Sequence, residues 1–367
     1  MLRILFALVM FMHGIIHLLG FVKAFDLAEM SQLTQDISKF TGVLWLINTF
    51  LFLGTVVLFL SKKEWWWTLG LFAVVLSQIL IMTQWQDAKF GTIANLIILI
   101  PVIIGFACWN FNLQINNETK ELLLENKFET KIITEEMIKD LPAPVQKWLK
   151  YSEVIGKEQV HTVYLKQKGL MKLKPDQKEW LESEAEQYFT IDKPAFIWRV
   201  KTSMAGLPVV GRDLFRDGQG KMQIKLAGII PVANVANNPK INAPALQRFL
   251  GEITWFPQAA LSPYIKWEPI NDYSARATMT YGETTGSAVF YFDEKGELTK
   301  FVAFRFKDIA DPEPKEWVAK MVETKTINGI KVPTKLEASW QLEDGEFTWY
   351  KFEISDLTYN TINQSAN

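Results

Sequence analysis

The sequence has few of the residues on which common catalytic and metal centres depend. Among its 367 residues there is one cysteine, Cys108, and there are three histidines. A single cysteine excludes a disulfide within the chain and any cysteine-based zinc cluster. His161 is the only histidine outside the apolar N-terminal part, so a Ser–His–Asp triad is not expected.

Short catalytic motifs are missing as well. The chain has no G-x-S-x-G elbow, no P-loop, no H-E-x-x-H and no C-x-x-C. Its one G-x-G, at residues 218–220, lies in a predicted turn without the strand and helix of a dinucleotide-binding unit. The catalytic residues of an enzyme would therefore be unknown, no cofactor is predicted, and the missing motifs favour a protein that is not an enzyme.

Neither half of the chain has an excess of basic residues. Residues 1–111 carry six Lys and Arg against five Asp and Glu, and the remainder carries 33 against 35. Nucleic acid is therefore not an expected partner.

Long apolar runs are confined to residues 1–111, and each approaches the roughly 20 residues that cross a hydrocarbon core. They lie at Leu2–Phe25, Phe40–Leu60, Trp65–Thr83 and Phe90–Trp109. The first run lacks a small-x-small cleavage site and three more runs follow it, so a membrane helix is expected rather than a signal peptide. The sequence thus predicts a transmembrane domain of four helices over residues 1–111.

The charges that flank the runs predict an orientation. With four spans, the side that holds both termini has Arg3, Lys62, Lys63, Lys120 and Lys127, and the other side has Lys23, Lys39 and Lys89. Because basic loops stay in the cytoplasm, this difference places the C-terminal part in the cytoplasm.

His13 and His17 are four residues apart and share one face of the first predicted helix. Such a pair binds haem or a metal, relays protons, or joins helices by hydrogen bonds. The other runs supply only neutral polar residues at similar depth, so we favour hydrogen bonding and predict no metal.

Residues 112–134 are predicted to be a linker, and residues 135–367 an α+β domain. Alternating apolar and polar residues predict antiparallel strands joined by turns such as Asp217–Gly218 and Asn328–Gly329. The predicted strands are 161–165, 180–190, 196–205, 208–216, 219–227, 273–281, 286–293, 298–307, 317–327, 331–342 and 347–359. They form a curved antiparallel sheet, a half-open barrel, around a central helix at 243–256.

The central stretch, Ala243–Pro263, has an apolar face with helical spacing. Pro257 predicts that the helix ends or kinks at Trp255 and Phe256. The segment is either a core helix or a helix that lines a ligand cavity with Trp255 and Phe256.

The strongest polar candidates are Arg212, Asp213 and Glu252. They hold a charged head group, act as acid and base, or form surface ion pairs around a hairpin.

Four blocks of the C-terminal part resemble recurring blocks of an uncharacterised bacterial family. They are LPAPVQKWLKY at 141–151, GLPVVGRDLF at 206–215, KMQIKLAGIIPVAN at 221–234 and WFPQAALSPYIKWE at 255–268. In that family, membrane helices often precede a domain of unknown function, so the resemblance implies no activity. At the level of architecture the domain is also similar to the half-barrels of lipoprotein carriers, whose concavity holds acyl chains.

The hypothesis that follows is a protein of the bacterial inner membrane whose β-rich domain binds a hydrophobic ligand, a lipid above all. The expected partners are the bilayer and that ligand, and protein partners are not predicted. One alternative is a membrane-associated enzyme that uses Glu252, Arg212 and Asp213. Another is a structural module of an envelope complex.

Overall fold

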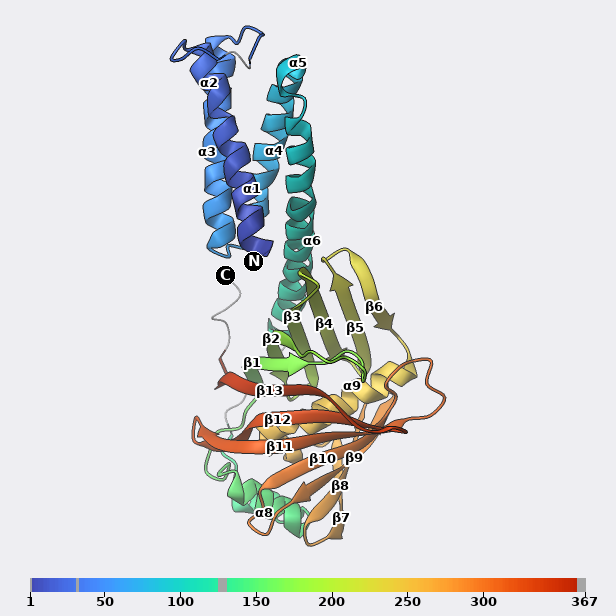
Figure 1. Cartoon of the computed structure of the whole chain (residues 1–367). Helices are drawn as coiled ribbons and strands as arrows, with labels where there is room; N and C mark the ends of the chain where they lie inside the picture. Colours follow the sequence, from blue (N-terminus) through green and yellow to red (C-terminus); the bar gives the residue numbers. More distant parts are fainter. Residues whose placement is uncertain (1, 31–32, 125–130, 362–367) are drawn as a thin grey trace. The chain divides into compact units, whose positions relative to one another are not determined.

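The computed structural model describes residues 2–30, 33–124 and 131–361 (Figure 1). Lys127, one of the residues used to predict the orientation, lies outside the described residues. The chain divides into two compact units, residues 1–113 with 227–229, and residues 114–226 with 230–367.

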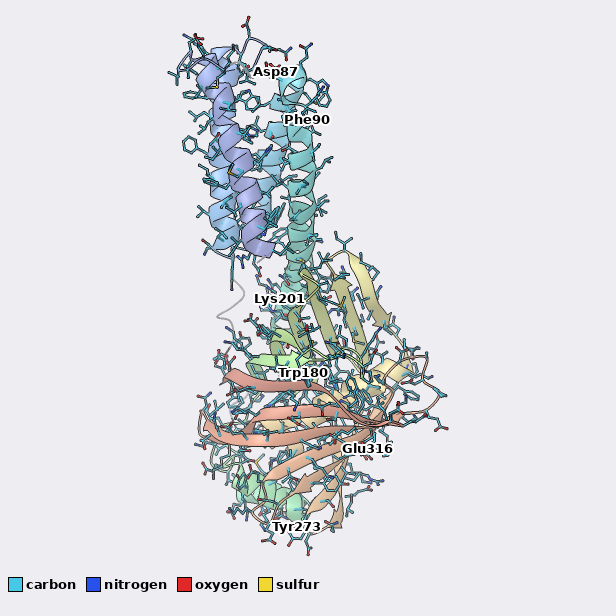
Figure 2. All side chains as sticks on the ribbon, viewed as in Figure 1. Asp87, Phe90, Trp180, Lys201, Tyr273 and Glu316 are labelled. Carbon is cyan, nitrogen blue, oxygen red and sulfur yellow. The ribbon has the colours of Figure 1, made fainter. Side chains whose placement is uncertain are left out.

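The first unit is helical, and its helices follow the predicted apolar runs. They are α1 (Leu2–Ile16), α2 (Leu18–Ala24), α3 (Lys39–Leu60), α4 (Trp66–Thr83), the short α5 (Trp85–Ala88) and the first part of α6 (Gly91–Leu124). Four spans are long and apolar enough to cross a membrane, with α1 and α2 forming one of them. Asp87 and Phe90 mark the end of this unit where α5 joins α4 to α6 (Figure 2).

Glycines allow α1 and α2 to pack closely against α3. A Cβ atom at Gly14 would lie 2.7 Å from Cβ of Phe52, and one at Gly20 would collide with the ring of Trp45. Small residues at such contacts are typical of helices that associate in a membrane.

α6 continues as a helix to Leu124, so residues 112–124 are helical although a linker was predicted there. Ile115, Leu122 and Leu123 are buried. An apolar stripe of this kind stabilises a helix by packing, and no glycine or proline between 112 and 124 interrupts it.

The second unit contains the last part of α6, the short helices α7 (Glu135–Ile138) and α8 (Ala143–Tyr151), and a large antiparallel sheet. Among the described residues the sheet has thirteen strands in the order β6-β5-β4-β3-β2-β1-β13-β12-β11-β10-β9-β8-β7. The strands are β1 (Thr162–Met171), β2 (Leu181–Thr190), β3 (Ala195–Met204), β4 (Leu207–Arg216), β5 (Gln219–Leu226), β6 (Ile230–Ala236), β7 (Ile265–Asn271), β8 (Ser274–Tyr281), β9 (Thr284–Phe292), β10 (Leu298–Arg305), β11 (Lys315–Ile327), β12 (Ile330–Leu342) and β13 (Gly345–Tyr359). The predicted fold class, apolar helices followed by a curved, open antiparallel sheet around a helix, is confirmed.

Two of these strands, β6 and β7, were not predicted. Each contains a proline, Pro231 in β6 and Pro269 in β7, and each lies at one edge of the sheet. Proline lacks the N–H that an inner strand needs, but an edge strand leaves one row of N–H groups unused. The hairpin before β6 turns at Ala227 and Gly228, with φ of 56° and 69°, and alanine seldom adopts this conformation.

The central helix α9 (Pro239–Glu252) begins four residues before the predicted start, at Pro239. The side chain of Asn238 caps it by accepting a hydrogen bond of 2.9 Å from the backbone N–H of Lys240. The helix ends at Glu252, and the 3-10 turns η1 (Ile253–Trp255) and η2 (Pro257–Leu261) continue on either side of Phe256.

α9 lies against both wings of the curved sheet, and we call the sheet face that it contacts the inner face (Figure 1). On one wing, Gly220 of β5 donates its backbone N–H to Asn242 at 2.9 Å. On the other wing, Gln247 donates to the carbonyl groups of Ser287 and Phe304 at 3.0 Å each. The core between helix and sheet contains seven fully buried phenylalanines, namely Phe189, Phe196, Phe215, Phe249, Phe256, Phe290 and Phe301.

Candidate functional site

Apolar side chains cover the inner face of β3 to β6. Contacts with α9 show which residues of β4 and β5 face inward. Asp213 of β4 binds Arg248, and a Cβ atom at Gly220 of β5 would lie 2.7 Å from the carbonyl oxygen of Ile241. Side chains alternate along a strand and paired residues share a face. Besides Thr202 and Gly211, the inner face beyond these contacts therefore carries nine apolar residues, namely Met204, Leu207, Val209, Met222, Ile224, Leu226, Ile230, Ala233 and Val235. We call these nine residues the apolar strip.

The apolar strip is not closed over by the described residues. Met204 is 38% exposed, Leu207 39% and Ile230 56%, and of the nine residues only Val209 is buried. The opposite side of β5 is polar, with Lys221, Gln223 and Lys225. The strand therefore has the alternation of a sheet with one covered face, but its apolar face is accessible.

A charged cluster lies at the inner end of the strip, where Asp213 pairs across the sheet with Met222. Arg248 of α9 donates from Nη1 to Asp213 Oδ2 at 2.7 Å and from Nε to Glu252 Oε1 at 2.9 Å. Glu252 Oε2 accepts a further bond of 2.7 Å from Gln187 Nε2. The positive charge of Arg248 is therefore balanced by Asp213 from β4 and by Glu252 from the next turn of α9.

Two aromatic rings of β3 pack against the guanidinium of Arg248. Its guanidinium lies 4.7 Å from the ring centre of Trp198 and 5.0 Å from that of Phe196. Burial raises the pKa of Glu252 above its ordinary value, while Arg248 and Gln187 act in the opposite direction.

Arg305 completes the cluster. It follows Phe301 and Ala303 on the inner face of β10, and its guanidinium lies 4.6 Å from the ring centre of Trp317. It is close enough to Arg248, Asp213 and Glu252 to interact with them electrostatically. Burial, followed by the charge of Arg248, lowers the pKa of Arg305 to about 10, so the group stays protonated at neutral pH.

The five predicted ligand-binding residues fall into three places. Asp213 and Glu252 meet through Arg248, as described above. Arg212 lies on the other face of β4, where its Nε is 3.5 Å from Glu118 of α6 and its Nη2 donates to Gln223 at 3.0 Å. The acid–base set of the enzymatic alternative is therefore divided between two faces of the sheet.

Trp255 and Phe256 are core residues, with exposures of 1% and 0%. Trp255 donates from its indole N–H to the carbonyl of Pro333 at 3.1 Å. Packing accounts for both side chains, and their contact with a ligand stays a prediction.

A model described as "Family of unknown function (DUF6544)" matches residues 131–352. The chain belongs to this family. The match confirms the resemblance that the four sequence blocks indicated. All residues of the apolar strip and of the charged cluster lie inside the matched range, so both belong to the DUF6544 domain.

Comparison with solved structures finds a LolA superfamily protein from Nitrosomonas europaea, with a TM-score of 0.32 and 11% sequence identity. The similarity covers 60% of this chain and 96% of that protein. Comparison with curated proteins gives no match.

His13 and His17 lie in the helical first unit, before the DUF6544 domain, and belong to a hydrogen-bond network. His17 donates from Nδ1 to the carbonyl of His13 at 2.8 Å, and its Nε2 lies 2.9 Å from Oγ of Ser77. His13 Nε2 lies 2.9 Å from Oδ1 of Asn95, and Nδ2 of Asn95 donates to Oε1 of Gln78 at 3.0 Å. Within the described part of the chain, no three His, Cys, Asp or Glu residues are placed to hold a metal ion.

Proposed function

We propose that the DUF6544 domain of this chain binds the acyl chain of a lipid on the apolar strip. The observation that carries the proposal is the strip itself, nine apolar side chains on one face of four adjacent strands, most of them accessible. Contiguous exposed apolar surface is unfavourable in water and marks a binding site for protein, membrane or ligand.

A lipid chain fits this surface better than a compact ligand does. The strip extends along β5 from Met222 to Leu226 and crosses to the neighbouring strands, so an extended acyl chain can contact several of its side chains at once. Each methylene group that the strip removes from water contributes about 0.8 kcal/mol. The same chain carries four spans that fit a membrane, which is a source of such lipids.

Photo-crosslinking tests the proposal. The full chain is reconstituted in phosphatidylcholine nanodiscs and irradiated with methyl palmitate that bears a diazirine in its chain, and the labelled peptides are identified by mass spectrometry. We expect label on peptides from 204–235. The double variant Ile224→Asn/Leu226→Asn should lower this label about tenfold, because two apolar contacts are lost.

The matched control is Lys221→Asn/Lys225→Asn, which changes alternate positions of the same strand on its outer face. It should label like the parent chain. Equal loss in both double variants, or label confined to the helical unit in the parent, would refute the proposal. Label on the membrane helices serves to normalise the amount of probe in each sample.

We further infer that the chain resides in a bacterial inner membrane with the DUF6544 domain in the cytoplasm, as the loop charges predict. A reporter that is active only in the cytoplasm, fused after Asn367, should therefore give a signal. Activity of a periplasmic reporter alone at the same position would reverse the orientation.

A further inference from the structure

Arg248 and Arg305 are neighbouring cations with different surroundings. Arg248 has hydrogen bonds to Asp213 and Glu252 at 2.7 and 2.9 Å. The side chain of Arg305 has no hydrogen bond or ion pair to any described residue, and its Nε is shielded from solvent. Trp317 supports the flat face of its guanidinium but leaves the N–H donors in the plane without an acceptor.

A shielded guanidinium donor without an acceptor is costly, because its hydration is lost and nothing replaces it. Asp213 and Glu252 accept hydrogen bonds from Arg248, and among the described residues neither accepts one from Arg305. The arrangement suits an additional anion, which would bring its own acceptor oxygens to Arg305.

The place of Arg305 connects it to the apolar strip. Gln247, which precedes Arg248 on α9, donates to the carbonyl of Phe304, which precedes Arg305 on β10, at 3.0 Å. Arg248 binds Asp213 at 2.7 Å, and Asp213 pairs directly with Met222, the innermost strip residue of β5. A ligand with its head at Arg305 would therefore have its chain on the strip. An amphiphile of this kind satisfies the apolar surface and the cation together.

We propose that Arg305 binds the anionic head group, a carboxylate or a phosphate ester, of an amphiphile whose acyl chain lies on the apolar strip. This inference rests on the proposed function and adds the chemical class of the ligand. It also supplies a basis for selection, since an acyl chain alone gains little by leaving one apolar phase for another. The charged head distinguishes a ligand from the neutral and zwitterionic lipids around it.

Three photoactive probes with the same diazirine chain test the inference, namely palmitic acid, hexadecyl phosphate and methyl palmitate, with the full chain in phosphatidylcholine nanodiscs. We expect both anionic probes to label 204–235 more strongly than the ester, and their order tells carboxylate from phosphate recognition. In Arg305→Gln, label from the better anionic probe should fall about tenfold, while label from the ester should be unchanged.

Arg276→Gln, an exposed arginine of β8, is the control and should label like the parent with every probe. Arg305→Lys keeps the charge but loses the forked donors, so it should retain part of the label from the anionic probes. Such partial labelling would show that the loss of label in Arg305→Gln is not caused by misfolding. Equal labelling by acid, phosphate and ester, with no change in Arg305→Gln, would overturn the head-group inference and leave the acyl-chain proposal intact. Absence of label on 204–235 from every probe would overturn both.

Discussion

At Arg248 one guanidinium holds two carboxylates that come from different elements. Asp213 lies on β4 and Glu252 one helical turn after Arg248 on α9, and the side chains of all three are less than 20% exposed. Hydrogen bonds between charged groups at such sites are stronger than those at a surface because water competes little for them. The arrangement fixes α9 against the wing of the sheet that carries the apolar strip.

Glu252→Gln should therefore destabilise the chain. The substitution removes one of the two negative charges that face Arg248, and Arg305 nearby adds repulsion. We expect a loss of about 1–3 kcal/mol in the free energy of unfolding, since Asp213 keeps Arg248 partly satisfied. Denaturation followed by tryptophan fluorescence measures it, and Glu268→Gln, at an exposed position of β7, should change stability little. An unchanged stability in Glu252→Gln would show that the cluster contributes nothing to the fold.

The sequence identified Asp213 and Glu252 but not the residue that joins them. Arg248 stands on α9 among apolar neighbours, and its partners come from β2, β3 and β4. Contacts between elements so far apart along the chain depend on how the sheet curves around the helix. Helical spacing shows that Arg248 and Glu252 share a face, but it does not show what that face contacts.

At the scale of elements, local patterns predicted most of the structure and failed at identifiable places. Asp217 and Gly218 adopt φ of 53° and 77°, as a tight hairpin requires, and this turn was predicted. The Ala227–Gly228 turn also has positive φ at both residues but not the usual residue types, so β6 was missed and with it a third of the apolar strip. The alternation in residues 221–226 is the sequence signal for the strip, but the same alternation is typical of any half-buried strand.

The helical unit offers a second test at this scale. Ser77 on α4 lies at hydrogen-bond distance from both His13 and His17, 3.2 and 2.9 Å away. If the histidines act by joining helices, Ser77→Ala should lower stability by about 0.6–1.7 kcal/mol, the range of single hydrogen bonds inside membrane proteins. Thermal unfolding in detergent measures this loss, with the exposed Ser61→Ala as control.

The same reading predicts that purified protein has no Soret band and that His13→Asn and His17→Asn are mild. A stoichiometric haem spectrum that is lost in either variant would assign the pair to a cofactor instead.

At the scale of the whole molecule, the sequence was sufficient for the order of parts and for the fold class. Apolar runs of about 20 residues and period-two alternation are local properties, and each determines its element almost alone. The position of the candidate site does not follow from such local properties. Trp255 and Phe256, the large aromatic residues beside Pro257, were predicted to contact a ligand, and both are buried. The accessible apolar surface consists instead of Met, Leu, Ile, Val and Ala side chains on β3 to β6.

That difference explains the function we propose. Phe249, Trp255 and Phe256 are buried in the core, whereas most of the strip is accessible to a ligand. Four apolar spans are long enough to cross a membrane, so the lipid that we propose as ligand would leave a phase in which its acyl chain is already solvated. Net binding then depends on the shape of the strip and on a head-group contact such as that of Arg305.

A crystal structure of the full chain grown with bromine-labelled palmitic acid, with the bromine on the acyl chain, tests the central claim most directly. Anomalous scattering locates the bromine independently of how the lipid is built. The account predicts a bromine peak over the inner face of β4–β6, beside Ile224 and Leu226. Bromine peaks only against α1–α6, with an empty strip, would contradict it.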